Sequence, residues 1–204
     1  MKTNTQHTND SGFALLMTII VVGVVLSVGL TILDLSIKQV RLADSAKESE
    51  ISFHAANAGL ECARYWRREE AASMESGGPF TPTCFEVASA AVVPNANPNP
   101  NPSRVPSSGA FNNGDAYLYE YEFTWGAGLD RCTKIATLVV SSDLSGNGFE
   151  TDNMESLFSG YPDGSTYFCE PGAQCSVVSV RGYNKPCNNI SQYGTIQREV
   201  LLQF

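Results

Sequence analysis

The sequence predicts an α+β fold, in which one long N-terminal helix packs on a C-terminal antiparallel sheet of about four strands. Three observations support this prediction. An uncharged apolar run continues without a break into an amphipathic helical pattern, the second half of the chain holds four segments with strand periodicity, and Gly- and Asn-rich turns separate those segments. A helix followed by strands in series is the order expected of an α+β domain.

The composition fits one compact head with a core of its own, since 43% of the 204 residues are hydrophobic and 17% are charged. The formal net charge is −8. A nucleic-acid groove needs clustered Lys and Arg, so no nucleic-acid partner is expected from the charge. The two histidines are His7 and His54, and no nucleophile elbow, phosphate loop or HExxH motif occurs. We therefore expect neither enzymatic activity nor a metal or other cofactor.

Residues 13–33, which read FALLMTIIVVGVVLSVGLTIL, contain no charge. As a helix this segment spans about 31 Å, which matches the apolar core of a bilayer. A cleaved secretory signal has a shorter apolar stretch and a small-residue cleavage site directly after it. The segment is therefore predicted to be a transmembrane helix that contacts membrane lipid.

Residues 34–70 are predicted to continue the same helix as an amphipathic rod, because no Pro or Gly interrupts the stretch from Thr31 to Ala58. Apolar side chains recur at three- and four-residue steps, as expected of a stripe that covers the sheet. The stripe consists of Ile37, Val40, Ile51, Ala55, Ala58, Cys62 and Tyr65.

Residues 71–115 are predicted to be a loop region that includes an exposed Pro/Asn-rich stretch at 94–109. Residues 116–204 are predicted to form the sheet, with strands that begin near Tyr117, Lys134, Cys175 and Thr195.

The first of these strands has two chemically different faces. One face carries Tyr117, Tyr119, Tyr121, Phe123 and Trp125, and the other carries Glu120, Glu122 and Thr124. We interpret the aromatic face as core, and a sugar- or base-stacking platform is the alternative.

The six cysteines suit an oxidising compartment, so the head is expected outside the cytoplasm. Basic residues after the apolar segment, including Lys38 and Arg41, would by the positive-inside rule place the head inside, but we give the cysteines more weight. Free buried thiols are the alternative to disulfides. Six cysteines allow fifteen pairings. The preferred scheme is Cys62 with Cys84, Cys132 with Cys187, and Cys169 with Cys175.

Residues 143–155 have some features of a calcium loop. Asp143, Ser145 and Asn147 alternate, but the acid that should close the loop is displaced by one position to Glu155. The alternative is a Gly-Asn turn between strands with solvated acids. The sequence leaves calcium binding open.

Gly12 followed by FALLMTIIVV resembles the cleavage signal of type IV prepilins, and the polar residues 1–12 resemble their leader peptide. Residues 55–66, AANAGLECARYW, and the RGYN stretch from Arg181 to Asn184 also resemble parts of bacterial pilin-like proteins. The resemblance implies that a prepilin peptidase cuts between Gly12 and Phe13, and that the new Phe13 amine is methylated. It further implies that residues 13–33 become the core helix of a filament, packed on other pilin subunits, and that the head is a pilin-like sheet.

Met17 stands at the fifth position after the implied cut, where most major pilins carry a glutamate. By analogy, its absence favours the role of a minor pilin or pseudopilin, or of a subunit at the tip, over that of a major subunit. Gly23 and Ser27 stand four residues apart, which would let another helix approach closely, although both are also tolerated in membrane helices without such a role.

The resemblance implies a structural subunit of a type IV pilus, a type II secretion filament or a competence-type filament, with adhesion or assembly initiation as a further role. Before assembly it would be a single-pass membrane protein with an extracytoplasmic head, and afterwards part of an extracellular filament. The competing interpretation is an uncleaved single-pass anchor that displays a binding domain and forms no filament. The sequence names no surface ligand.

Overall fold

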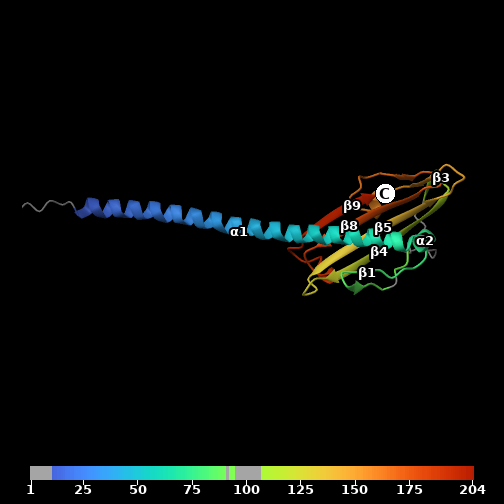
Figure 1. Cartoon of the computed structure of the whole chain (residues 1–204). Coiled ribbons are helices and arrows are strands. Elements are labelled where there is room, and N and C mark those ends of the chain that lie inside the picture. The colour runs from blue at the N-terminus through green and yellow to red at the C-terminus, as the bar shows by residue number, and fades with distance from the viewer. Residues whose placement is uncertain (1–10, 91, 95–106) are drawn as a thin grey trace, which may run out of the picture. The chain divides into compact units, whose positions relative to one another are not determined.

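The computed structural model describes residues 11–90, 92–94 and 107–204 (Figure 1). The chain forms two compact units, Met1–Lys47 and Glu48–Phe204. The second of these is the head. Most of the expected leader and most of the Pro/Asn-rich stretch lie outside the described residues.

Helix α1 runs from Ser11 to Glu69 and has 59 residues. It contains the whole apolar segment, residues 13–33, and continues into the head. The prediction of one helix through both parts is confirmed, and its end lies one residue before the predicted Glu70. No proline occurs in this range, and the next glycine pair, Gly77 and Gly78, comes after the short helix α2 (Ala71–Glu75).

The main sheet has four antiparallel strands in the order β4-β5-β8-β9 (Figure 1). They are β4 (Gly114–Trp125), β5 (Arg131–Ser142), β8 (Gln174–Tyr183) and β9 (Gln197–Gln203). All four predicted strands are present, and the predicted α+β class is confirmed. A short loop joins β4 to β5, and a longer connection, residues 184–196, joins β8 to β9, so that these strands lie next to their sequence neighbours in the sheet.

Side chains alternate across the sheet, and both faces carry apolar residues. Toward α1 the sheet presents Tyr119, Phe123, Ile135, Val139, Val178 and Val180, all buried. Toward the opposite side it presents Leu118, Leu138, Val140 and Val177. The sheet is therefore the middle layer of the head.

The side of α1 that packs on the sheet consists of small residues, together with Arg67 near the helix end. Ser52, Ala56 and Ala63 are at most 1% exposed. The predicted stripe is wrong in four members, because Ile37, Val40, Ala58 and Tyr65 are exposed. The prediction followed apolar character and passed over Ser52 and Gly59, although a helix that lies very close to a sheet has room only for such small residues.

Two glycines mark the point of closest approach between α1 and the sheet. A Cβ added to Gly182 on β8 would lie 2.1 Å from the carbonyl oxygen of Ser52 and 2.5 Å from the backbone nitrogen of Ala56. A Cβ added to Gly59 on α1 would lie 2.3 Å from Cγ2 of Thr133. The contact between helix and sheet is therefore partly a contact between backbones.

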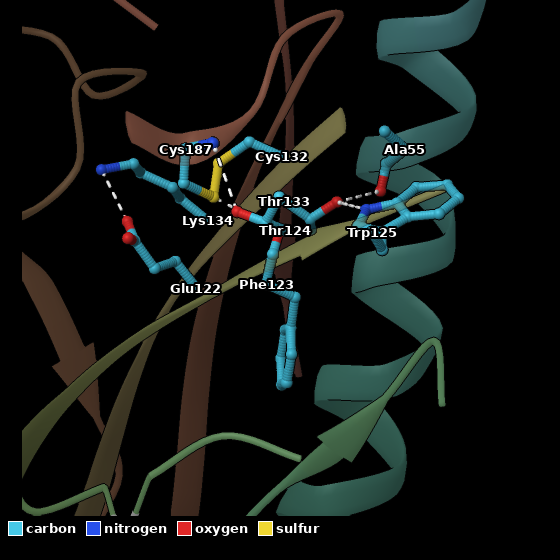
Figure 2. Close-up of a disulfide and its surroundings, with 9 residues drawn as sticks. All are labelled: Ala55, Glu122, Phe123, Thr124, Trp125, Cys132, Thr133, Lys134 and Cys187. Carbon is cyan, nitrogen blue, oxygen red and sulfur yellow. Dashed lines mark hydrogen bonds and ion pairs between the residues drawn. A yellow bond between two sulfur atoms is a disulfide. The ribbon is translucent and has the colours of Figure 1, made fainter. Parts of the chain in front are cut away.

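Hydrogen bonds accompany this contact. The hydroxyl of Thr133 accepts a bond from Nε1 of Trp125 (2.9 Å) and donates one to the carbonyl oxygen of Ala55 (3.2 Å), as Figure 2 shows. The hydroxyl of Ser52 donates to the carbonyl oxygen of Ile196 (3.0 Å). These bonds satisfy polar groups that the close packing removes from water.

A smaller sheet covers part of the opposite face of the main sheet. It has the order β3-β6-β7, with β3 (Ser107–Asn112), β6 (Phe149–Thr151) and β7 (Tyr167–Cys169). Phe149 and Phe158, together with Met154 of helix α3 (Met154–Leu157), pack on Leu138 and Val177 to form a second core cluster. The sequence did not predict this layer.

The predicted loop region, residues 71–115, is wrong in extent. It contains α2, the two-residue strands β1 (Thr83–Cys84) and β2 (Val87–Ala88), strand β3 and the start of β4. Strands β1 and β2 have two residues each and are too short to show a periodicity, so the sequence carried no signal for these two strands.

Three disulfides join Cys62 to Cys84, Cys132 to Cys187, and Cys169 to Cys175, which are the preferred pairs. Each one connects a peripheral element to a central one. Cys62 ties α1 to β1, Cys132 ties β5 to the short 3-10 helix η1 (Cys187–Asn189) in the β8–β9 connection (Figure 2), and Cys169 ties β7 to β8.

Replacing Gly182 with Ala is expected to lower the free energy of unfolding by at least about 3 kcal/mol, the upper end for overpacking, because the new methyl group meets helix backbone. Gly59→Ala should cost less, since its neighbours are side chains that can rotate. Gly128→Ala is the control, because nothing lies within 4 Å of its Cβ position. Urea unfolding followed by circular dichroism measures all three, and equal stability of Gly182→Ala and Gly128→Ala would contradict the close backbone contact.

Removal of the Cys132–Cys187 disulfide, by changing both residues to Ala, is expected to destabilise the head more than removal of Cys169–Cys175. The two bridges close loops with sequence separations of 55 and 6 residues. The loop-entropy estimate is about 4 kcal/mol for the first and about 2 kcal/mol for the second. Thermal unfolding of both double variants tests the order, and a non-reducing peptide map that joined Cys62 to Cys187 would contradict the pairing itself.

Candidate functional site

The apolar segment, residues 13–33 of α1, is the most unusual surface of the chain. Its large apolar side chains are between 48% (Met17) and 69% (Leu30) exposed. By length and composition α1 is able to cross a membrane. In water such a surface would be strongly unfavourable, so the segment requires an apolar environment, either lipid or protein.

The polar side chains of the apolar segment are satisfied within the helix. The hydroxyls of Thr18, Ser27 and Thr31 each donate a hydrogen bond of 2.8 Å to the carbonyl oxygen three residues earlier. A helix that satisfies its hydroxyls in this way can enter lipid without losing hydrogen bonds to water.

Charge begins directly after the apolar segment. The carboxylate of Asp34 and the ammonium of Lys38 pair at 2.8 Å, with both side chains about two-thirds exposed. This pair lies one helical turn apart, and a pair so exposed contributes little to stability. The pair marks the place along α1 where the helix surface changes from apolar to charged.

The expected processing and packing residues all lie at the start of α1. Gly12 is in the first turn of the helix, Phe13 is 68% exposed, and Met17 lies one turn later. Nothing lies within 4 Å of the Cβ position of Gly23, and Ser27 is exposed one turn further on. Gly23 and Ser27 thus leave a shallow notch on the helix surface, and no side chain of the described residues fills it.

The aromatic row of β4 is core, as interpreted from the sequence. Tyr119 and Phe123 are at most 1% exposed, and the hydroxyl of Tyr119 donates to the carbonyl oxygens of Met74 (3.0 Å) and Gly78 (3.1 Å). Burial raises the pKa of the Tyr119 hydroxyl far above its usual value. Rings held in this way cannot serve as a stacking platform.

Trp125, at the end of the row, is only partly buried, but its ring is in contact with Phe85 and lies near Arg131. The ring of Phe85 stacks on it at 4.4 Å between centroids, and the guanidinium of Arg131 lies 5.6 Å from its centroid. Phe85 is held in the left-handed region with φ of 57°, next to Cys84. Such a conformation is costly for a bulky residue and indicates that the surrounding contacts fix it.

The calcium-loop interpretation does not fit the fold of residues 143–155. Strand β6 occupies the second half of the segment and pairs with both β3 and β7. Asp143, Ser145 and Asn147 lie before this strand, and Glu155 lies after it, in α3. Because the extended strand stands between them, the four residues do not form the continuous loop that would wrap around an ion. Among the described residues, the group close enough to share a metal is Glu122, Cys132 and Cys187, whose two sulfurs form a disulfide.

A groove of about 530 Å³ lies in the head between the end of α1, α2 and strands β8 and β9. We call it the arginine groove. It is lined by Leu60, Arg64, Arg67, Arg68, Ala71, Glu75, Gln174, Leu202 and Phe204. Sequence reasoning missed it, although the RYWRREE stretch at the end of the helix gave a signal, because its other walls come from distant strands.

The floor of the arginine groove is fixed by a buried ion pair. Arg67, 8% exposed, donates from Nη2 to Oε1 of Glu75 (2.7 Å) and from Nε to the hydroxyl of Ser176 (2.8 Å). The side-chain amide of Gln174 donates to the other oxygen of Glu75 (2.7 Å). Arg67 and Glu75 therefore neutralise each other, and the remaining charged side chains of the lining are Arg64, which pairs with Glu61, and Arg68.

Comparison with models of protein families, with curated proteins and with solved structures gives no match. An N-terminal apolar helix fits a membrane anchor or signal, and three disulfides suggest an extracytoplasmic domain. A long N-terminal apolar helix packed on a four-strand antiparallel sheet is a pilin-like architecture.

Proposed function

We propose that the chain is a minor pilin or pseudopilin, a structural subunit of a type IV pilus, type II secretion or competence-type filament. One observation carries the proposal. A single helix offers an uncharged, predominantly apolar exposed surface along residues 13–33 and a tightly packed surface from Ser52 to Ala63. The exposed segment is suited to packing against other subunits, and the packed segment attaches the head to the same helix.

The apolar segment would have two environments in succession. In the membrane, lipid covers its side chains, and in the filament, equivalent helices of other subunits cover them. Lipid and neighbouring helices both keep the same apolar area away from water. The hydrophobic free energy of the segment therefore changes little when the subunit passes from the membrane into the filament. In this proposal a prepilin peptidase first removes residues 1–12, and the head stays on the extracytoplasmic side.

Met17 supports a minor position. A subunit whose fifth mature residue is apolar has no carboxylate with which to neutralise the N-terminal amine of a neighbour inside the apolar core. A filament made only of such subunits would bury unpaired amines. The proposed role is therefore structural, with assembly initiation or adhesion by the head, and not enzymatic.

Processing at Gly12 is the first test. When the chain is produced together with a prepilin peptidase, the mature N-terminus is expected to be N-methylated Phe13, and a Gly12→Leu variant should stay uncut. Intact mass and N-terminal sequencing of the purified chain measure both. An intact Met1 in the presence of the peptidase would instead support the uncleaved single-pass anchor, and a start after Leu33 would contradict retention of the helix.

Close helix packing at the notch is the second test. Changing Gly23 and Ser27 to Leu together is expected to weaken association between helices at least about fivefold, from the loss of roughly 1 kcal/mol of packing. The head should keep its melting temperature, because nothing contacts the Gly23 position within the subunit. Val25→Leu, on the opposite side of the helix, is the matched control. Capture of untagged by tagged chain from membranes measures association, and equal capture by all variants would show that the notch has no packing role.

A further inference from the structure

The arginine groove combines charge and apolar surface. Its walls include the side chains of Leu60, Leu202 and Phe204, and its rim carries Arg64 and Arg68. Arg64 pairs with Glu61 at 3.1 Å, both well exposed, whereas Arg68 has no ion-pair partner in the described part of the chain. Such a groove suits an apolar side chain that stands next to a carboxylate.

The chain presents that combination on its own surface, at the β5–β6 turn. The side chain of Leu144 is 93% exposed, and Asp143 precedes it without an ion-pair partner among the described residues. Among the large aliphatic side chains that the structure describes, Leu144 is the most exposed.

Backbone hydrogen bonds fix the residues that directly precede Leu144. The amide of Asp143 donates to the carbonyl oxygen of Asn113 (2.9 Å), and its own carbonyl accepts from the amide of Gly172 (3.0 Å). The amide of Ser142 donates to the carbonyl oxygen of Ala173 (3.0 Å). A preorganised turn loses little conformational freedom when it binds.

The charge around the turn is complementary to that of the groove. Between Lys134 and Arg181 the chain contains no Lys or Arg, and this stretch carries the acids Asp143, Glu150, Asp152, Glu155, Asp163 and Glu170. The stretch that bears Leu144 therefore carries acids and no Lys or Arg, while the lining of the groove carries three arginines and one glutamate. Complementary potentials of this kind select a partner and its orientation.

We propose that the Asp143–Leu144 turn of one copy of this chain docks in the arginine groove of a second copy, with Leu144 against Leu60 and Leu202 and with Asp143 beside Arg68. The contact goes beyond the filament proposal, because it concerns the heads and does not require that the apolar helices assemble.

Other exposed apolar tips of the head fit the groove less well. Leu129 is 58% exposed, but the neighbouring Asp130 already lies 3.8 Å from Arg131. Tyr193 is fully exposed, but its carbonyl accepts a hydrogen bond from Lys185, which would bring positive charge to a positive rim. Leu144 is thus the tip whose surroundings match.

The contact is small compared with the interface of a stable complex, so on its own it should be weak. Copies held side by side by their membrane or filament helices would meet at a high effective concentration, and a weak contact then becomes populated. The experiment should therefore use the full chain and not an isolated head.

A photo-crosslinker tests the contact directly. The full chain with p-benzoylphenylalanine in place of Leu144 is mixed with isotope-labelled chain in detergent micelles and irradiated. Crosslinks from position 144 of one copy to residues 60–71 or 202–204 of the other are expected. The same probe in place of Leu129 is the control for proximity caused by the helices alone.

A charge exchange provides the second readout, since both side chains are exposed and the fold should tolerate the changes. Arg68→Glu and Asp143→Arg alone should each reduce the crosslink yield at least about threefold, and the double variant should restore at least half of it. Crosslinks from position 144 no more frequent than from position 129, or a double variant as weak as the single ones, would overturn the contact between copies. Uncut chain that retains Met1 but gives the crosslink would contradict only the filament proposal.

Discussion

The head depends on the distance between α1 and the main sheet. Gly182 lets the strand backbone approach Ser52 and Ala56, and Gly59 lets the helix approach Thr133. Once the two backbones are this close, the register between helix and sheet is fixed, because any larger residue at these positions would separate them. Gly59 belongs to the AANAGLECARYW stretch and Gly182 to RGYN, so the two segments that resemble pilin-like proteins meet at this point.

The other stabilising features are arranged around that contact. The bonds from Thr133 to Ala55 and from Ser52 to Ile196 lie beside it, and the second core cluster supports the sheet from its opposite side. Each disulfide joins a short peripheral element to this centre. Elements such as β1 and β7, which are too short to be stable alone, thus persist because they are covalently tied.

The sequence predicted the features that have a long local pattern. Helix α1 and the strands β4, β5, β8 and β9 show clear periodicity, and the three disulfides are the pairs preferred among the fifteen possible schemes. It did not predict the small sheet, whose strands pair over long sequence distances, or the arginine groove, whose walls meet only in the folded head. It also misplaced the buried side of α1, because Tyr65 looked more suitable for a core than Gly59, although only the smaller residue fits.

The hydroxyls of the apolar segment bind their own helix, and this limits what the segment can recognise. Thr18, Ser27 and Thr31 have donated their protons to the preceding turn, so they offer a neighbour acceptor oxygens but no donor. The segment can therefore distinguish one surrounding helix from another only by contour and by these few acceptors. In a cell that makes several kinds of similar subunit, sorting them correctly would then be a task for the water-exposed heads.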